Sequence, residues 1–179
     1  MANVYTDIVT NFVATPSVKN DSQQLHGVKR IAQGTIALAA GDLSATDTVM
    51  LAPIPTNASI SSIKLFNDDL DSGTTNTTDV GLYTTAIVAV DDDAYASAIT
   101  DLRGAVTTGT EVAFEARNIN KCGQKVWEDA GQSSDPGGYY YVALTFDAAD
   151  NTSRVTFTSL LELRRTVSFD FFMSCLEYW

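Results

Sequence analysis

The sequence predicts an all-β fold, a jelly-roll-like β-sandwich with one or two short helices and extended terminal segments. Roughly seven to nine runs have the alternating or β-branched pattern of strands, and connections rich in Thr, Ser, Gly and Asp separate them. No internal repeat is visible, which argues against propellers and solenoids. Sheets that carry one apolar face bury it by packing together, so a sandwich or jelly roll is the simplest architecture.

The chain length favours one folded domain flanked by two terminal segments. A chain of 179 residues can bury roughly 70% of the surface that it exposes when unfolded. Residues 1–28 begin apolar and become polar, and we expect them to form an N-terminal arm. We expect residues 29–166 to form the β-sandwich (jelly-roll) domain and residues 167–179 to form an apolar C-terminal segment.

Three strands are expected in the first part of the domain. Residues 30–42 form a strand that ends in a Gly-Asp turn. Residues 47–55 form a second strand, whose Pro53 and Pro55 exclude its continuation as a central strand. Residues 58–68 mix alternation with a slip of one residue, which indicates a bulge or bend.

The middle of the chain is expected to contain a loop, a strand and a helix. Residues 68–79 are rich in Asp, Gly, Thr and Asn and predict the loop, and residues 80–90 are typical of a buried strand. Residues 91–104 predict the helix, because three aspartates can cap its start, apolar residues follow at helical spacing, and a glycine ends the run. We interpret Asp91, Asp92 and Asp93 as this cap in preference to a metal site.

The next stretch gives a weaker pattern. Residues 110–118 fit a strand or a short helix, and the sequence leaves both open. Residues 121–131 predict one or two amphipathic helical turns, with Val126 and Trp127 pointing inward and Gly131 at the end.

The last two strands are expected to form a β-hairpin with a long loop at residues 147–154. In the first of them, YYYVALTF, one face carries Tyr139, Tyr141, Ala143 and Thr145, and the residues between them form the other face. Tyrosines and β-branched residues suit a pleated strand. We therefore interpret the tyrosines as part of the sheet in preference to an aromatic ligand platform.

Both terminal segments are expected to contact other molecules. Each carries apolar side chains at a position where a chain usually frays in water, and such exposed apolar surface usually marks a contact. The C-terminal segment fits either a last strand in the core or docking on another subunit, and we favour the subunit contact. The candidate interaction residues are Val4, Tyr5, Ile8, Phe12, Phe169, Phe171, Phe172, Tyr178 and Trp179.

No set of catalytic or cofactor-binding residues can be named. The single histidine, His26, lies in the polar arm with no rigid scaffold beside a nucleophile, and zinc finds no ligand set. Glycine motifs that bind phosphate do not occur. We therefore expect that the protein is not an enzyme and needs no cofactor.

Two features of the polar residues stay open. Residues 67–79 resemble a calcium loop in oxygen spacing, but Gly73 comes one place late and Thr78 stands where a bidentate Glu belongs, so only a looser site is possible. A disulfide between Cys122 and Cys175 is an alternative to two free thiols, which we favour.

The charge excludes one class of partner. Twenty-two acidic residues against 11 basic ones give a formal net charge of −11, so a phosphate backbone would repel the chain. We expect no nucleic-acid binding. We also expect no membrane association, because the uncharged runs are too short and too polar to cross a bilayer.

Three patterns carry a resemblance to a known family: DVGLY at residues 79–83, KVWEDAG at residues 125–131, and the pair YYYVALTF and VTFTSLLEL. Together with the order of elements over residues 29–163, they resemble structural proteins of tailed-bacteriophage virions, especially capsid decoration (cement) proteins with a jelly-roll domain. The resemblance implies a non-enzymatic protein on the exterior of the virion head. It further implies a homo-oligomer, often a trimer, that binds the major capsid protein and stabilises the shell. The aromatic segment after Arg165 departs from this pattern and leaves the mode of assembly open.

A second function remains as the alternative, a carbohydrate-binding module of a phage tail or fibre. In that case Trp127 and the three tyrosines, Tyr139, Tyr140 and Tyr141, would stack on sugar rings. Binding to glycans would separate this alternative from the capsid role.

Overall fold

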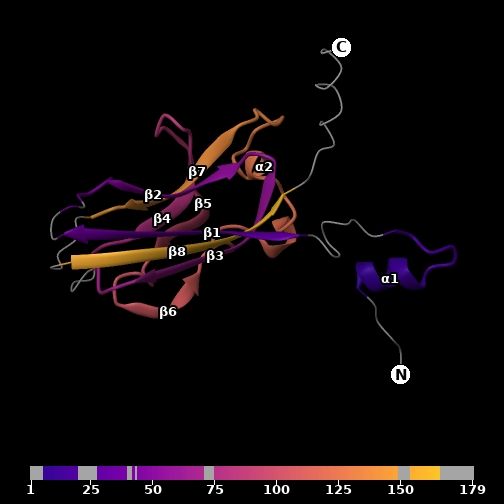
Figure 1. Ribbon diagram of the computed structural model, residues 1–179, viewed down its shortest axis with the longest axis horizontal. Helices are drawn as coiled ribbons and strands as arrows, with labels where there is room; N and C mark the ends of the chain where they lie inside the picture. Colours follow the sequence, from indigo (N-terminus) through magenta and orange to yellow (C-terminus); the bar gives the residue numbers. More distant parts are fainter. Residues whose placement is uncertain are drawn as a thin grey trace, which may run out of the picture.

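A computed structural model shows two packed β-sheets, with short helical elements outside them (Figure 1). It describes residues 6–19, 28–39, 42, 44–70, 75–148 and 154–165. The strands are β1 (Lys29–Ala39), β2 (Thr48–Pro55), β3 (Ala58–Asn67), β4 (Thr78–Tyr83), β5 (Ala89–Ile99), β6 (Val106–Glu111), β7 (Tyr139–Phe146) and β8 (Arg154–Arg165). The helical elements are α1 (Asp7–Val13), the 3-10 turn η1 (Ile119–Lys121) and α2 (Val126–Asp129). None of the described helices is long and apolar enough to span a membrane.

The strand order is that of a jelly roll. One four-stranded sheet has the order β1-β8-β3-β6 and the other has the order β2-β7-β4-β5. Every paired neighbour is antiparallel. Among the strands that the structure describes, β4 and β5 are the only consecutive pair in the same sheet, so each of the other six connections crosses between the sheets. This arrangement confirms the all-β sandwich that the sequence predicts.

The core lies between the two sheets and follows the alternation of the strands. On β7 the outer face holds Tyr139, which is 54% exposed, and the half-buried Tyr141. The inner face of the same strand, with Tyr140, Val142, Leu144 and Phe146, is buried in the hydrophobic core. The fully buried side chains include Ile54, Ile60, Ile63, Leu65, Leu82, Tyr95, Leu144, Phe146 and Leu161.

Two local predictions about strands β2 and β3 are also confirmed. β2, which carries Pro53 and Pro55, is an edge strand of its sheet. Proline has no backbone N–H to donate, and an edge strand tolerates this because one of its sides has no neighbouring strand to bond. The register of β3 slips against β8 between Ile60 and Ser62, at the place where the alternation of its residues is interrupted.

The predicted hairpin of the last two strands is wrong, although both strands exist. β7 pairs with β2 and β4, whereas β8 pairs with β1 and β3 in the other sheet. The connection between β7 and β8 therefore crosses the sandwich instead of reversing within one sheet. The alternation of residues defines a strand locally, but its partner depends on the whole topology.

The single strand expected at residues 80–90 is also wrong. β4 ends at Tyr83, and the chain turns back at once into β5. The backbone N–H of Thr84 donates to the carbonyl of Val88 at 2.8 Å, and Ile87 has a positive φ of 60°. Ile87 and Val88 lie in this turn, 61% and 59% exposed, and so contribute little to the core.

The helix predicted at residues 91–104 is wrong, because residues 91–99 belong to strand β5 and turns follow. The pairing of β5 with β4 is irregular, with three register shifts, and these bulges place buried residues at spacings that imitate a helix. The carboxylate of Asp79 holds one bulge by accepting a 2.6 Å hydrogen bond from the backbone N–H of Ala98, whose φ is 50°. Asp91, Asp92 and Asp93 therefore lie within a strand and do not cap a helix.

The residues between β6 and β7 agree with the sequence only in part. Of residues 110–118, only the first two belong to a strand, because β6 ends at Glu111 and turns follow. The helical turn expected at residues 121–131 is present as α2, with Val126 buried and Trp127 half-buried. Gly131 ends it with a φ of 68°, a conformation that glycine adopts without strain.

Candidate functional site

The N-terminal helix exposes an apolar surface. α1 has seven residues and lies apart from the sandwich (Figure 1). Phe12 is 77% exposed and Val13 is 53% exposed, while Ile8 is half-buried. A helix this short is marginal in water without a surface to pack on. Of the predicted interaction residues, Ile8 and Phe12 therefore lie where a partner could reach them.

The other predicted interaction residues cannot be placed. Val4 and Tyr5 lie outside the described residues, and so do Phe169, Phe171, Phe172, Tyr178 and Trp179. Their role as contacts stays a prediction. The same holds for His26 and for a disulfide of Cys175, whereas Cys122 is exposed and free.

A hollow lies on the outer face of the β1-β8-β3-β6 sheet, and sequence reasoning did not find it. Its volume is about 380 Å³, and its lining residues are Gln33, Phe66, Thr158 and Leu160. Phe66 lies over the backbone of Gly109 in β6, where a Cβ atom would come within 2.7 Å of its ring. Phe66 falls on the outer face only because of the bulges in β3, so the spacing of residues gave no clear signal for this surface.

The adjacent edge of the same sheet is apolar as well. On β1, Ile31 is 64% exposed and Ile36 is 39% exposed, and Val28 just before the strand is 75% exposed. At the middle of β1, Gly34 approaches β2 closely, because an added Cβ would lie 3.0 Å from the carbonyl oxygen of Leu51. The exposed apolar side chains of this edge therefore belong to a strand that lies close against β2.

The outer face of the other sheet carries the exposed aromatic residues. Tyr139 lies opposite Pro55 and Tyr141 lies opposite Pro53 in the pairing of β7 with β2. Trp127 lies at the same end, because its backbone N–H donates to the carbonyl of Thr56 at 3.1 Å. Tyr140 is only 8% exposed and points into the core, so it cannot stack on a sugar ring as the carbohydrate-binding alternative requires.

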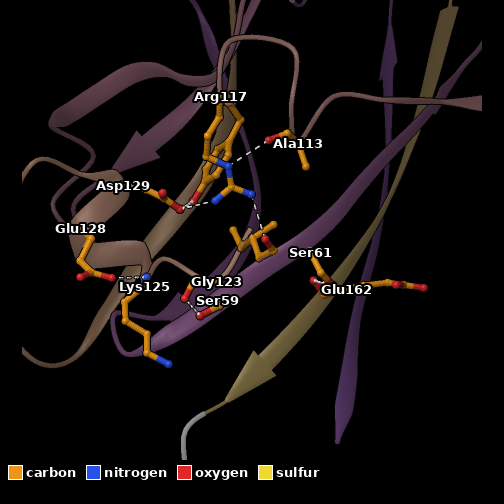
Figure 2. A network of polar contacts seen from close by, with 11 residues as sticks. Ser59, Ser61, Ala113, Arg117, Gly123, Lys125, Glu128, Asp129 and Glu162 are labelled. Carbon is orange, nitrogen blue, oxygen red and sulfur yellow. Dashed lines mark hydrogen bonds and ion pairs between the residues drawn. The ribbon is translucent and has the colours of Figure 1, made fainter. Parts of the chain in front are cut away.

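A buried ion pair joins α2 to the sandwich (Figure 2). Nη1 of Arg117 donates to Oδ2 of Asp129 at 2.6 Å, and the two side chains are only 3% and 1% exposed. The guanidinium also donates to the carbonyl oxygens of Ala113, at 3.2 Å, and Ile60, at 2.9 Å. Because Arg117 thus satisfies groups on three segments, this network positions α2 against β3.

Aromatic rings complete the surroundings of this ion pair. Cζ of Arg117 lies 4.9 Å from the ring centroid of Tyr95 and 4.7 Å from that of Phe114. The hydroxyl of Tyr95 donates to Oδ2 of Asp129 at 3.1 Å. Burial raises the pKa of Tyr95 well above 10.0, and burial also raises the pKa of Asp129, which the charge of Arg117 offsets only in part. The enclosed groups hold the fold together and are shielded from any substrate.

An acidic cluster lies on β5. Oxygen atoms of Asp91, Asp92 and Asp93 come within 4.8 Å of one another, close enough to share a cation. Burial raises the pKa of Asp91, and the neighbouring aspartates raise it further. Asp92 and Asp93 are exposed, and exposed acidic groups are common without a metal. The cluster therefore does not by itself define a metal site.

Asn67, the first ligand position of the calcium-loop pattern, is engaged in hydrogen bonds within the protein. The side-chain amide of Asn67 is buried and donates to the carbonyl oxygens of Leu102, at 2.7 Å, and Gly104, at 3.1 Å. Asp71 and Gly73 lie outside the described residues. In the described part of the loop, Asp68 accepts a hydrogen bond from the backbone N–H of Thr156 at 3.1 Å. These contacts fasten the loop to the ends of neighbouring strands.

Comparison with known proteins gives a likeness in structure. No protein-family model and no curated protein matches the chain in sequence. A chain in the cyanophage Pam1 capsid asymmetric unit has a TM-score of 0.53 and 16% identity, over 78% of this chain and 86% of that one. A chain in the capsid of Ralstonia phage GP4 has a TM-score of 0.52 and 17% identity, also over 78% of this chain and 86% of that one. At these identities the likeness shows a shared fold.

Proposed function

We propose that the protein is a structural protein of a bacteriophage virion, located on the outside of the head, where it binds the major capsid protein and stabilises the shell. The observation that carries this proposal is the shared fold with chains of two phage capsid structures, over 86% of the length of each. This likeness extends over most of both chains, which supports the proposal that the whole jelly-roll domain is used in a similar setting. A trimeric decoration (cement) protein is the form of this role that we favour.

The surfaces support a role in assembly more than a role in chemistry. The exposed apolar features of the described residues include α1, the β1 edge and the hollow beside it, and all of them are open to a neighbouring protein. The side chains of Arg117 and Asp129 are paired with each other and closed to solvent, so this buried ion pair is not accessible to a substrate. Several weak contacts on a repeating lattice combine into strong attachment, so separate small surfaces suffice.

The test is the location of the protein in particles and the effect of its loss. We expect it in the particle fraction after gradient purification of virions that carry this chain, and a trace of the chain on the outer head surface by electron microscopy. Heads that lack the protein should release DNA at a lower temperature than heads to which it is added back. Absence from the particle fraction, or a position inside the shell, would contradict the proposal.

A carbohydrate-binding role remains the second candidate because of one observation, the exposed ring of Tyr139 beside the half-buried Tyr141 and Trp127. Stacking on a sugar face needs such an accessible ring. A glycan array tests it with Tyr139→Ala, since loss of glycan binding on this change would favour the alternative. Thr85→Ala, in the exposed turn between β4 and β5, serves as the control.

A further inference from the structure

The hollow on the outer sheet face is built by three strands in two adjacent rows. Gln33 of β1 lies opposite Leu160 of β8, which in turn lies opposite Lys64 of β3. In the next row, Thr158 of β8 lies opposite Phe66. Directly opposite residues of antiparallel strands share a face, so these side chains surround one space.

This space is open, and its floor and walls are mostly apolar. Leu160 and the ring of Phe66 are half-buried, and the volume of about 380 Å³ is many times the ~30 Å³ that a water molecule occupies. The neighbouring Ile31, on the same face as Gln33, is 64% exposed. An apolar side chain of aromatic size would fill such a space and cover this surface.

The C-terminal segment supplies side chains of this kind. Residues 166–179 follow β8 in the chain, and Phe169, Phe171 and Phe172 come early in this segment. In an extended conformation Phe169 and Phe171 point to one side, so two rings can enter one surface together.

The course of β8 favours the segment of a neighbouring copy over the chain's own segment. β8 passes the hollow at Leu160 and runs five residues further before it ends at Arg165. To return, the chain would have to reverse within Thr166, Val167 and Ser168, of which only Ser168 is of a type that favours tight turns. The two β-branched residues, Thr166 and Val167, favour extended backbone over a tight turn, and this preference favours a neighbouring copy as the receiver of the aromatic side chains.

Charge favours this face over the opposite one. The segment contains Asp170 and Glu177, and the opposite sheet carries Asp79 and the acidic cluster of β5. Lys64 lies beside the hollow, is exposed, and takes part in neither the Lys29–Glu162 nor the Arg117–Asp129 ion pair.

The nearby acids on the hollow's own sheet are engaged. Glu162 pairs with Lys29 at 2.5 Å, and the carboxylate of Glu111, across from Lys64, accepts hydrogen bonds from the hydroxyl of Ser62 and the backbone N–H of Ile63. Glu111 keeps its charge, but Lys29 and Lys64 balance Glu162 and Glu111 on this sheet, so an acidic segment is repelled less here than on the opposite sheet with its four aspartates.

We infer that the hollow lined by Gln33, Phe66, Thr158 and Leu160 receives phenylalanine side chains from the C-terminal segment, residues 167–179, of a second copy of this chain. Copies of the protein are then joined by exchange of these segments. The inference deepens the proposed function, because it names the contact that joins copies on a shell.

Cross-linking in a mixture of two full-length variants tests the exchange. The donor carries Cys122→Ser and keeps the native Cys175 in the segment. The acceptor carries Cys122→Ser, Cys175→Ser and Gln33→Cys at the rim of the hollow, so a disulfide between the two proteins can only join different copies. With mild diamide oxidation, we expect this disulfide to form roughly tenfold faster than with an acceptor that has Thr85→Cys instead, since docking raises the effective concentration.

A charge change gives a second readout without altering the core. Lys64→Glu in the acceptor should slow the cross-link several-fold, whereas Lys121→Glu, an equally exposed lysine on η1, should leave its rate unchanged. Equal rates for the Gln33→Cys and Thr85→Cys acceptors would overturn the inference. A variant that carries Gln33→Cys and the native Cys175 in the same chain gives a further test. If it forms only an internal disulfide and stays monomeric, the inference is also overturned.

The cross-linking test of segment exchange and the particle test of the proposed function can fail independently. The cross-link is measured on free protein, whereas the proposed function is measured by the presence of the protein on particles. Protein that is found on virions but does not cross-link at Gln33→Cys would refute segment exchange and leave the capsid role intact. Protein that cross-links at Gln33→Cys but is absent from particles would refute the capsid role and leave segment exchange intact.

Discussion

The substitution Gly81→Ala should destabilise the sandwich severely. Gly81 lies in the centre of β4, and β5 crosses its outer side so closely that an added Cβ would lie 2.2 Å from the carbonyl carbon of Asp92. The same Cβ would lie 2.3 Å from the carbonyl oxygens of Asp91 and Asp92. All three are backbone atoms, so no side-chain rotation can relieve the overlap.

The size of the expected loss in stability follows from how far the backbone of β5 would have to move. To reach an ordinary contact of about 3.5 Å, the backbone of β5 has to shift by more than 1 Å, which breaks its pairing with β4 and loosens the packing of Tyr95 and Ala96 behind it. Overpacking of a rigid site costs about 1–3 kcal/mol, and loss of strand pairing adds to this cost. We therefore expect a loss of at least about 3 kcal/mol in the free energy of unfolding.

Urea unfolding, followed by tryptophan fluorescence and far-UV circular dichroism, measures this loss. Gly104→Ala is the matched control, because nothing lies within 4 Å of its added Cβ. The control should be neutral or gain a few tenths of a kcal/mol from a less flexible unfolded chain. A Gly81→Ala protein within about 0.5 kcal/mol of the unchanged protein would refute the close crossing of β5 over β4.

Three further predictions concern the ion pair, the acids and the arm. Asp129→Ala leaves the charge of Arg117 buried and should cost about 3–5 kcal/mol in urea unfolding, whereas replacing both residues by apolar ones should recover part of that loss. Burial raises the pKa of Asp79 and Asp91 above 3.8, so the folded state binds protons more readily than the unfolded chain. The contribution of these two groups to stability is therefore full below their unfolded pKa of 3.8 and is lost as pH rises through their folded-state pKa values, so the melting temperature at about pH 4 relative to that at pH 7 should be lower in Asp91→Asn than in the unchanged protein. Phe12→Ser should change the unfolding free energy by less than about 0.5 kcal/mol but weaken binding to capsid particles about tenfold in a sedimentation assay.

Elements with a regular local pattern could be predicted from the sequence. In β7 strict alternation assigns Tyr139 and Tyr140 to opposite faces, and the structure has one exposed and the other buried. In β2 the two prolines restrict the strand to an edge, because each lacks the N–H that a central ladder needs. Such features depend on the residue itself and its close neighbours along the chain.

The rest depends on contacts between distant residues. β5 is a strand because Asp79 and Gly81 of β4 accommodate its bulges, and nothing within residues 91–104 reveals this. The partner of β8 is likewise set by the topology and not by its own alternation. The hollow could not be predicted either, since its residues come from three strands and Phe66 reaches the outer face only after a slip in register.

The four edges of the two sheets differ in how well they resist pairing with another chain. β2 carries two prolines, β5 carries three consecutive aspartates, and β6 has only six residues. Prolines, charges and short length are the ways in which an edge strand avoids unwanted pairing. β1 has none of them past its first two residues, because its 11 residues continue without charge from Ile31 to Ala39. The unprotected edge and the hollow lie side by side on β1 and β8, so the same side of the molecule is left open to a neighbour by two independent features.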